Sequence, residues 1–328
     1  MKRLLPDGFV LVILAAVLLA SVLPARGGFA VAVAWASTIT ITLLFFLNGA
    51  RLTRRALLDG LVHWRLHVTI LATTFVLFPL LGVLAERALP DFLPPKAWLG
   101  VIFLVVLPST IQSSIAFTTV ARGNVAGAVT SAAFSNIFGL VLTPVLLTLL
   151  AGTREAAPSL SAIWSIVSEL LLPFVIGHLM RPLLISWIER HKRIVTLNDR
   201  GTIVLAVYSA FSSAVVAGLW HIMPPGEIAK LALVCAVLLT SGLCLSAGIA
   251  TLLGFSREDC IAIMFCGSKK TLASGVPMAR VLFPVADVGV ILLPIMIYHQ
   301  IQLMVCASIA SRLGRSAPVG EGGAFDPA

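Results

Sequence analysis

Two adjacent lysines stand in the middle of an apolar stretch near the C-terminal end of the sequence. The stretch reads FCGSKKTLASGVP over residues 265–277, and Lys269 and Lys270 lie at its centre. An ammonium group in membrane-like surroundings costs at least about 2.5 kcal/mol, so it must meet a partner, an anion or water. Such a group can bind an anion or exchange a proton. Ser268 and Thr271 flank the pair and add two hydroxyl groups.

Two further polar clusters lie inside apolar sequence. The first, in LPSTIQSS, begins at Pro108, which removes a backbone donor, and its side chains compete for backbone hydrogen bonds. The second consists of Ser131, Ser135 and Asn136 in the next apolar stretch. Their oxygen- and nitrogen-bearing side chains are candidates for binding a substrate or an ion: Ser109, Thr110, Gln112, Ser113, Ser114, Ser131, Ser135 and Asn136.

The composition identifies a membrane protein. Hydrophobic residues make up 59% of the 328 residues and charged residues only 11%, against about 25% charged residues in a soluble domain, and the mean hydropathy is +1.04. The basic residues alternate with apolar spans rather than gathering with aromatic residues on one face, which argues against nucleic-acid binding.

The sequence contains no GxSxG, HExxH or phosphate-binding loop, so we predict neither an enzyme nor a bound cofactor.

Ten membrane-spanning helices are predicted. A bilayer core about 30 Å thick requires about 20 helical residues, and the first apolar run is interpreted as a retained helix because no convincing cleavage site follows it. Cutting the chain at its Pro, Gly and charge clusters gives spans at 8–25, 28–50, 68–86, 97–120, 126–151, 159–180, 202–221, 229–253, 259–283 and 286–311.

The basic residues between the spans predict the orientation. With the N-terminus inside, 15 Lys and Arg residues fall in cytoplasmic segments and 5 outside, namely Arg26, Arg87, Lys96, Arg154 and Lys230. The positive-inside rule then places both termini and the 181–201 loop in the cytoplasm. We therefore expect an integral, multi-pass protein of the plasma (inner) membrane.

The spans contain a weak internal repeat. The pattern G-x-x-x-x-P occurs at Gly139 and Pro144 and again, 150 residues later, at Gly289 and Pro294. Because five is odd, two halves of five spans would be inverted in the membrane, and paired interrupted helices would indicate a transporter site near the midplane. We expect repeats at 1–152 and 153–313, a disordered cytoplasmic tail at 314–328, and unwound segments near 108–114 and 267–271 that cross. The alternative is that Gly, Ser and Thr only allow close helix packing.

Four stretches resemble the bile acid:sodium symporter family (solute carrier family 10), and most closely its SBF-like, member 7-type branch. They are ATTFVLFP from Ala72, LPSTIQSS, ARGN from Ala121 and CGSKKTL from Cys266. The resemblance covers nearly the whole chain. It implies an all-α fold of two inverted five-helix repeats, in which a core domain (helices 3 to 5 and 8 to 10) moves against a panel domain (helices 1, 2, 6 and 7). Broken helices 4 and 9 would cross in the core.

The resemblance also implies sodium ligands, but this sequence keeps only some of them. Ser113 and Ser114 stand at the family's first sodium site, and Thr74 retains an oxygen where the family has Gln. Ala128 and Ala132 have lost the hydroxyl groups expected in helix 5, and the ninth span has no counterpart of the family's Glu. The two lysines occupy that region instead, and an ammonium would repel a sodium ion. We therefore expect sodium to bind weakly or not at all.

The lysines leave three interpretations open. In the first, one of them is a tethered cation beside Ser113 and Ser114 that binds the substrate, or gives up a proton, in a secondary active transporter of small organic anions working by alternating access. In the second, a lysine pairs with Glu169, the carboxylate most deeply placed in the sixth span, and the chain is a membrane regulator or scaffold. In the third, one lysine reaches water along its stem and the other caps half-helix carbonyls.

A usual sodium-coupled symporter is the remaining alternative. His299, inside the tenth span, is either a hydrogen-bonded packing residue or part of a proton relay. The expected partners are a small organic anion and the lipid bilayer. Substrate identity and oligomeric state do not follow from these residues.

Overall fold

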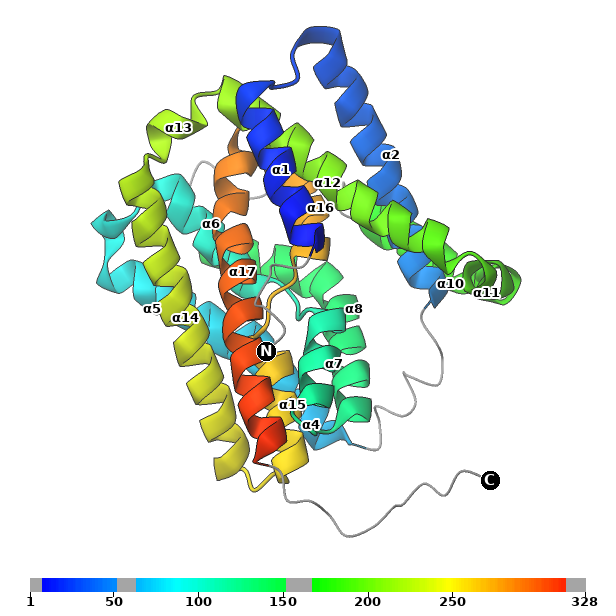
Figure 1. Cartoon of the computed structure of the whole chain (residues 1–328), viewed down its shortest axis with the longest axis vertical. Coiled ribbons are helices and arrows are strands. Elements are labelled where there is room, and N and C mark those ends of the chain that lie inside the picture. Colours follow the sequence, from blue (N-terminus) through cyan, green and yellow to red (C-terminus); the bar gives the residue numbers. More distant parts are fainter. Residues whose placement is uncertain (1–7, 52–62, 152–166, 317–328) are drawn as a thin grey trace.

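The computed structural model describes residues 8–51, 63–151 and 167–316, and all the secondary structure in these ranges is helical (Figure 1). Five of the described helices are long and apolar enough to cross a membrane, or six if one bent pair counts as a single span. Large apolar side chains such as Leu18 and Trp35 are exposed, as expected where lipid is the solvent. The prediction of an all-α membrane protein is confirmed.

The helices of the first half follow the first five predicted spans closely. The third span contains a π-helical turn, and the fourth is interrupted. The elements are α1 (Gly8–Val22), α2 (Gly27–Arg51), α4 (Trp64–Ala72), the π-helix η1 (Thr73–Leu77), α5 (Phe78–Ala88), the 3-10 turn η2 (Pro90–Phe92), α6 (Pro95–Val106), α7 (Ile111–Val120) and α8 (Val125–Ala151).

The second half contains more helix than expected. Its elements are the π-helix η3 (Val167–Leu171), α10 (Leu172–Leu179), α11 (Arg181–Arg190), α12 (Lys192–Val216), α13 (Leu219–Ile222), α14 (Pro225–Leu252), α15 (Arg257–Ser268), α16 (Leu272–Leu282) and α17 (Val285–Arg315).

Two of the predicted boundaries need correction. The segment 181–201, predicted as a loop, forms α11 and the first part of α12, because its polar stretch KRIVTLNDR contains neither Gly nor Pro and can continue the helix beyond the apolar part. The predicted tail at 314–328 begins two residues too early, since α17 extends to Arg315, and residues 317–328 lie outside the described part of the chain. The sixth predicted span, 159–180, is described only from Val167.

Helices α2 and α10 touch backbone to backbone. A Cβ added to Gly49 would lie 1.9 Å from the carbonyl oxygen of Phe174, and a Cβ added to Gly177 would lie 1.9 Å from that of Phe46. Reciprocal glycines let two membrane helices approach this closely. Figure 1 places α2, α10 and α11 together at one side of the molecule and α5 and α14 at the opposite side. Helix α12 packs against α1 and α2 as well as against α16 and α17, so it connects these two pairs of helices.

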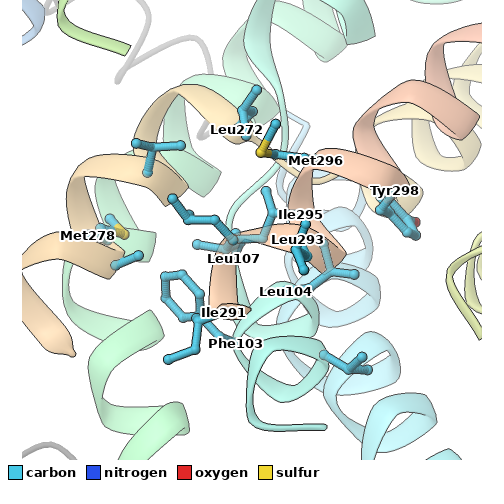
Figure 2. Close-up of a cluster of buried hydrophobic side chains, with 14 of the residues drawn as sticks. Phe103, Leu104, Leu107, Leu272, Met278, Ile291, Leu293, Ile295, Met296 and Tyr298 are labelled. Carbon is cyan, nitrogen blue, oxygen red and sulfur yellow. The ribbon is translucent and has the colours of Figure 1, made fainter. Parts of the chain in front are cut away.

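Helix α17 packs against α6, α7, α12, α14 and α16. Gly100 of α6 approaches the carbonyl oxygen of Ile291 in α17, where an added Cβ would lie at 2.9 Å. Figure 2 shows the apolar cluster at this junction, to which α6, α16 and α17 all contribute, including Phe103, Met278 and Ile295. This packing fixes the ends of the interrupted helices relative to one another.

Both helices with paired polar clusters are interrupted, over shorter stretches than expected. Helix α6 ends at Val106 and α7 begins at Ile111, with a bend of 61° between them. Helix α15 ends at Ser268, and α16 begins at Leu272. The unwound residues are thus 107–110 and 269–271, while residues 111–114 and 267–268, also expected to unwind, are helical. The backbone N–H of Thr271 donates to the carbonyl oxygen of Pro108 at 3.1 Å, so the two breaks touch.

Candidate functional site

The site consists of the two helix breaks, at 107–110 and 269–271, together with the side chains around them; we call this the crossing point. Lys269 and Lys270 are 0% and 1% exposed. Because consecutive side chains in extended backbone point in opposite directions, the two ammonium groups reach different surroundings. The Lys270 ammonium has hydrogen-bond acceptors around it, whereas the Lys269 ammonium has none among the described residues.

The Lys270 ammonium is fully hydrogen-bonded. Its Nζ donates to three backbone carbonyl oxygens, those of Thr74 (2.9 Å), Val105 (2.7 Å) and Leu107 (2.9 Å). A protonated lysine carries three N–H donors, so three acceptors satisfy it. The ring of Phe78 also faces the ammonium, with 4.6 Å between Nζ and the ring centroid. The interpretation in which a lysine caps half-helix carbonyls therefore describes Lys270.

The local fold explains why two of these carbonyls are free. Helix α6 ends at Val106, so the carbonyl groups of its last turn have no intrahelical partner and carry the negative end of the helix dipole. The N–H of Ser109, which would continue the helix by bonding Val105, instead donates to Ser135 Oγ at 2.9 Å. The Lys270 ammonium supplies the missing donor.

The third carbonyl is free because of a π-helical turn. In η1 the N–H of Phe78 bonds the carbonyl of Thr73, one residue farther back than in an α-helix. The same spacing would pair the carbonyl of Thr74 with the N–H of residue 79, but Pro79 has none. The Thr74 hydroxyl itself donates to the carbonyl of Ile70 within its own helix, and its role as an oxygen ligand stays a prediction. Thr74 contributes its backbone oxygen to the site.

Gln302 of α17 clamps the backbone of the second break. Its Oε1 accepts from the N–H of Lys270 and its Nε2 donates to the carbonyl of the same residue, both at 3.0 Å. Thr110 Oγ1 donates to that carbonyl as well, at 2.8 Å. The ring nitrogen Nδ1 of His299 lies 2.9 Å from Gln302 Nε2, and Tyr298 donates to the carbonyl of Ser268. Gln302 was not among the predicted site residues, although an amide in the middle of an apolar stretch was a usable signal.

The Lys269 ammonium has no hydrogen-bond partner among the described residues. Its Nζ lies 3.9 Å from the ring centroid of Phe117 in α7. Ser113, one helical turn before Phe117, has a buried Oγ that also lacks a hydrogen-bond partner in the described part of the chain. The buried cation thus contacts α7 one helical turn after a buried hydroxyl that also lacks a partner among the described residues.

Helix α8 ties the first break to the second. Asn136 Nδ2 donates to the carbonyl of Ser109 at 2.8 Å, and Ser274 of α16 donates to Asn136 Oδ1 at 3.3 Å. The hydroxyls of Ser109 and Ser114 lie 3.4 Å apart. Most of the candidate residues therefore gather at the crossing point.

Other candidate side chains bond away from the crossing point, are exposed or are not described. Ser131 Oγ lies 2.6 Å from Nδ1 of the buried His67, and Gln112 is exposed. Ser268 Oγ donates to Met264 within its own helix. Glu169 belongs to η3, but its side chain lies outside what the structure describes, so the proposed lysine–glutamate pair stays a prediction.

Comparison with known proteins identifies the family. The model of the SBF-like CPA transporter family matches residues 7–315. The chain belongs to this family. It is 46% identical over 309 residues to the putative symporter YfeH of Escherichia coli, covering 94% of this chain and 93% of that one. It is 50% identical over 314 residues to an uncharacterised protein of Pseudomonas aeruginosa, covering 95% and 94%.

A more distant relative connects this SBF-like chain with animal proteins. This chain is 27% identical over 281 residues to the sodium/bile acid cotransporter 7 of Rattus norvegicus, covering 82% of this chain and 80% of that one. The sequence resemblance to the bile acid:sodium symporter family is thereby confirmed. An SBF-like CPA transporter is a multi-pass membrane protein, and the apolar helices of this chain agree with that.

Proposed function

We propose that this chain is a secondary active transporter that carries small organic anions by alternating access, with Lys269 as the group that binds the anion or exchanges a proton with it. The family and the relatives support transport. The observation that supports an anionic substrate is the buried Lys269 ammonium without a hydrogen-bond partner in the described residues.

An unpartnered ammonium at this position calls for a second group. A cation–π contact with Phe117 is worth about 2 kcal/mol when water is excluded, which does not exceed the cost of at least about 2.5 kcal/mol for an ammonium in a membrane. A carboxylate or sulfonate would supply the missing charge and hydrogen bonds. The partnerless hydroxyl of Ser113 offers that anion a donor on the same helix.

The proposed architecture is two inverted repeats of five helices, at 1–152 and 153–313. The matched positions of the two breaks support it, as does the G-x-x-x-x-P pattern, whose residues lie in α8 and α17. In this proposal α1, α2, α10 and α12 form the panel domain, and the helices at the crossing point belong to the core domain. Both termini would lie on the cytoplasmic side of the plasma membrane.

Sodium coupling is the competing proposal, and the name of the animal relatives favours it. Two features of this chain oppose it. The buried methyl groups of Ala128 and Ala132 cannot bind a cation, and an ammonium already occupies the carbonyl groups around Lys270. We therefore propose that transport does not require sodium, and that a proton or no ion at all is coupled to the anion.

Uptake into proteoliposomes tests the proposal. The probes are taurocholate and benzoate, a sulfonate and a carboxylate, with sodium replaced by choline and the pH varied separately. We expect uptake of at least one probe that is unchanged in choline, and its loss in Lys269→Met. Lys230→Met is the matched control, because Lys230 lies outside the crossing point and pairs with Glu227. Strict dependence on sodium, or normal uptake by Lys269→Met, would contradict the proposal.

A further inference from the structure

The three carbonyl oxygens around Lys270 come from two separate parts of the chain. Thr74 lies in the π-helical turn of the third span, while Val105 and Leu107 lie at the broken end of α6. All three are backbone atoms, so no side-chain substitution removes them. Backbone carbonyls converging on one point are the arrangement with which membrane proteins replace the hydration shell of a monovalent cation.

We propose that the carbonyls of Thr74, Val105 and Leu107 form a monovalent-cation site whose permanent occupant is the Lys270 ammonium. The occupant is held at both ends. Its Nζ is fixed by the three carbonyls, and its backbone is fixed by Gln302 through two hydrogen bonds of 3.0 Å. An ion tethered in this way cannot be released to either side of the membrane. Any ion that drives transport must therefore act through another group.

The geometry favours an ammonium over a metal ion. Three N–H donors match three carbonyl acceptors at 2.7–2.9 Å. The ring of Phe78 covers a further side, at 4.6 Å from Nζ, and offers a cation–π contact rather than an oxygen ligand. A bare alkali ion would exchange its hydration shell for only three oxygens. We therefore expect the site to select primary amines, including methylammonium, whose methyl group would stand where the lysine side chain enters.

The site also has a structural consequence. The Lys270 ammonium joins the break between α15 and α16 to the end of α6 and to the turn at η1. If the cation were missing, three buried carbonyl dipoles would face one another without a donor, which is costly in an apolar interior. The cation therefore holds these three segments together as one body. This role does not depend on which substrate the protein carries.

Chemical rescue of Lys270→Ala tests the proposal. The substitution removes the ammonium and leaves a space beside the three carbonyls. The Tm of the purified, full-length variant is measured in the chlorides of ammonium, methylammonium, sodium and tetramethylammonium at equal ionic strength. We expect Lys270→Ala to melt below the wild type. Methylammonium and ammonium should raise its Tm by about 2 °C or more with a saturable concentration dependence, and tetramethylammonium should not.

Lys269→Ala is the matched control, since its ammonium contacts Phe117 and no carbonyl within hydrogen-bonding distance in the described residues. Methylammonium should leave its Tm and that of the wild type unchanged. If Lys270→Ala is lost on purification, the yield of monodisperse protein purified with and without methylammonium is compared instead. Equal responses of the two alanine variants, or no response of Lys270→Ala by either measurement, would overturn the proposal. Because the readout is stability, the result is independent of the transport assays.

Discussion

The backbone N–H of Thr271 donates a hydrogen bond to the carbonyl oxygen of Pro108, with 3.1 Å between the two atoms. This bond joins two helix breaks that lie far apart in the sequence. A helix that ends inside a membrane protein leaves carbonyl groups that need donors. Here each break supplies donors for the other, since Thr110 also donates to the carbonyl of Lys270. The two interrupted helices therefore depend on each other for their unwound geometry.

Gln302→Leu should destabilise the protein. The substitution removes both hydrogen bonds that Gln302 makes with the backbone of Lys270. The carbonyl retains Thr110 as a donor, whereas the N–H loses the one acceptor that it has among the described residues, and a buried donor left without a partner costs about 1–3 kcal/mol. The Tm in detergent measures the loss. The matched control is Gln300→Leu, two residues away on the same helix, whose side chain makes no hydrogen bond within the described part of the chain.

The packing of α2 against α10 gives a second prediction. Gly49→Ala would push a methyl group into the carbonyl oxygen of Phe174, so the helices must separate. We expect a loss of about 1–3 kcal/mol or more in the free energy of unfolding. The control is Gly248→Ala in α14, where an added Cβ meets nothing within 4 Å. It should be neutral or stabilise by up to about 1 kcal/mol, because alanine favours helix over glycine. Similar effects of the two substitutions would contradict this packing.

The sequence predicted the helices and their interruptions better than the roles of individual side chains. Pro108 and the hydroxyl-rich residues after it indicated the first break, because proline and competing side chains act locally. Gly275 and Pro277 are also residue types that interrupt helices, yet α16 continues through both residues. There α16 packs against α17, and a Cβ on Gly275 would contact Leu107, so tertiary packing favours the helix over the local signal.

The division of labour between the two lysines could not be predicted from sequence. The partners of Lys270 are backbone atoms more than 160 residues away, since the pairs with Leu107, Val105 and Thr74 span 163, 165 and 196 residues. A backbone carbonyl leaves no trace in the sequence. Only Pro79, which has no N–H, indicated that a carbonyl in the preceding turn lacks its donor. Side-chain patterns instead pointed to the Thr74 hydroxyl, which bonds its own helix.

The orientation in the membrane gives a third prediction. Arg190→Cys, in a variant whose five native cysteines are replaced, should react with a membrane-impermeant thiol reagent only after the cells are opened. The five replacements are needed because the native cysteines include the exposed Cys244. The expectation rests on the excess of Lys and Arg in the segments assigned to the cytoplasm. Labelling of residue 190 in intact cells would reverse the proposed topology.

The two lysines should respond in opposite ways to loss of charge. Lys270→Met leaves three buried carbonyls without their donor, and each unsatisfied group costs about 1–3 kcal/mol, so the Tm should fall strongly. Lys269→Met removes an ammonium that has no hydrogen-bond partner among the described residues and keeps an apolar stem against Phe117. Its Tm should stay unchanged or rise, while anion uptake is lost.

A double-mutant cycle separates this expectation from a structural ion pair with Glu169. If Glu169 pairs with Lys269, Lys269→Met should destabilise by leaving the carboxylate alone, and adding Glu169→Gln should restore the Tm. If Lys269 is free for a substrate anion, Lys269→Met and Glu169→Gln should act additively on the Tm. A coupling well above about 0.5 kcal/mol would favour the ion pair, since independent sites add within that margin. Additive effects together with lost uptake would assign Lys269 to the transported anion and leave Lys270 as the fixed cation of the crossing point.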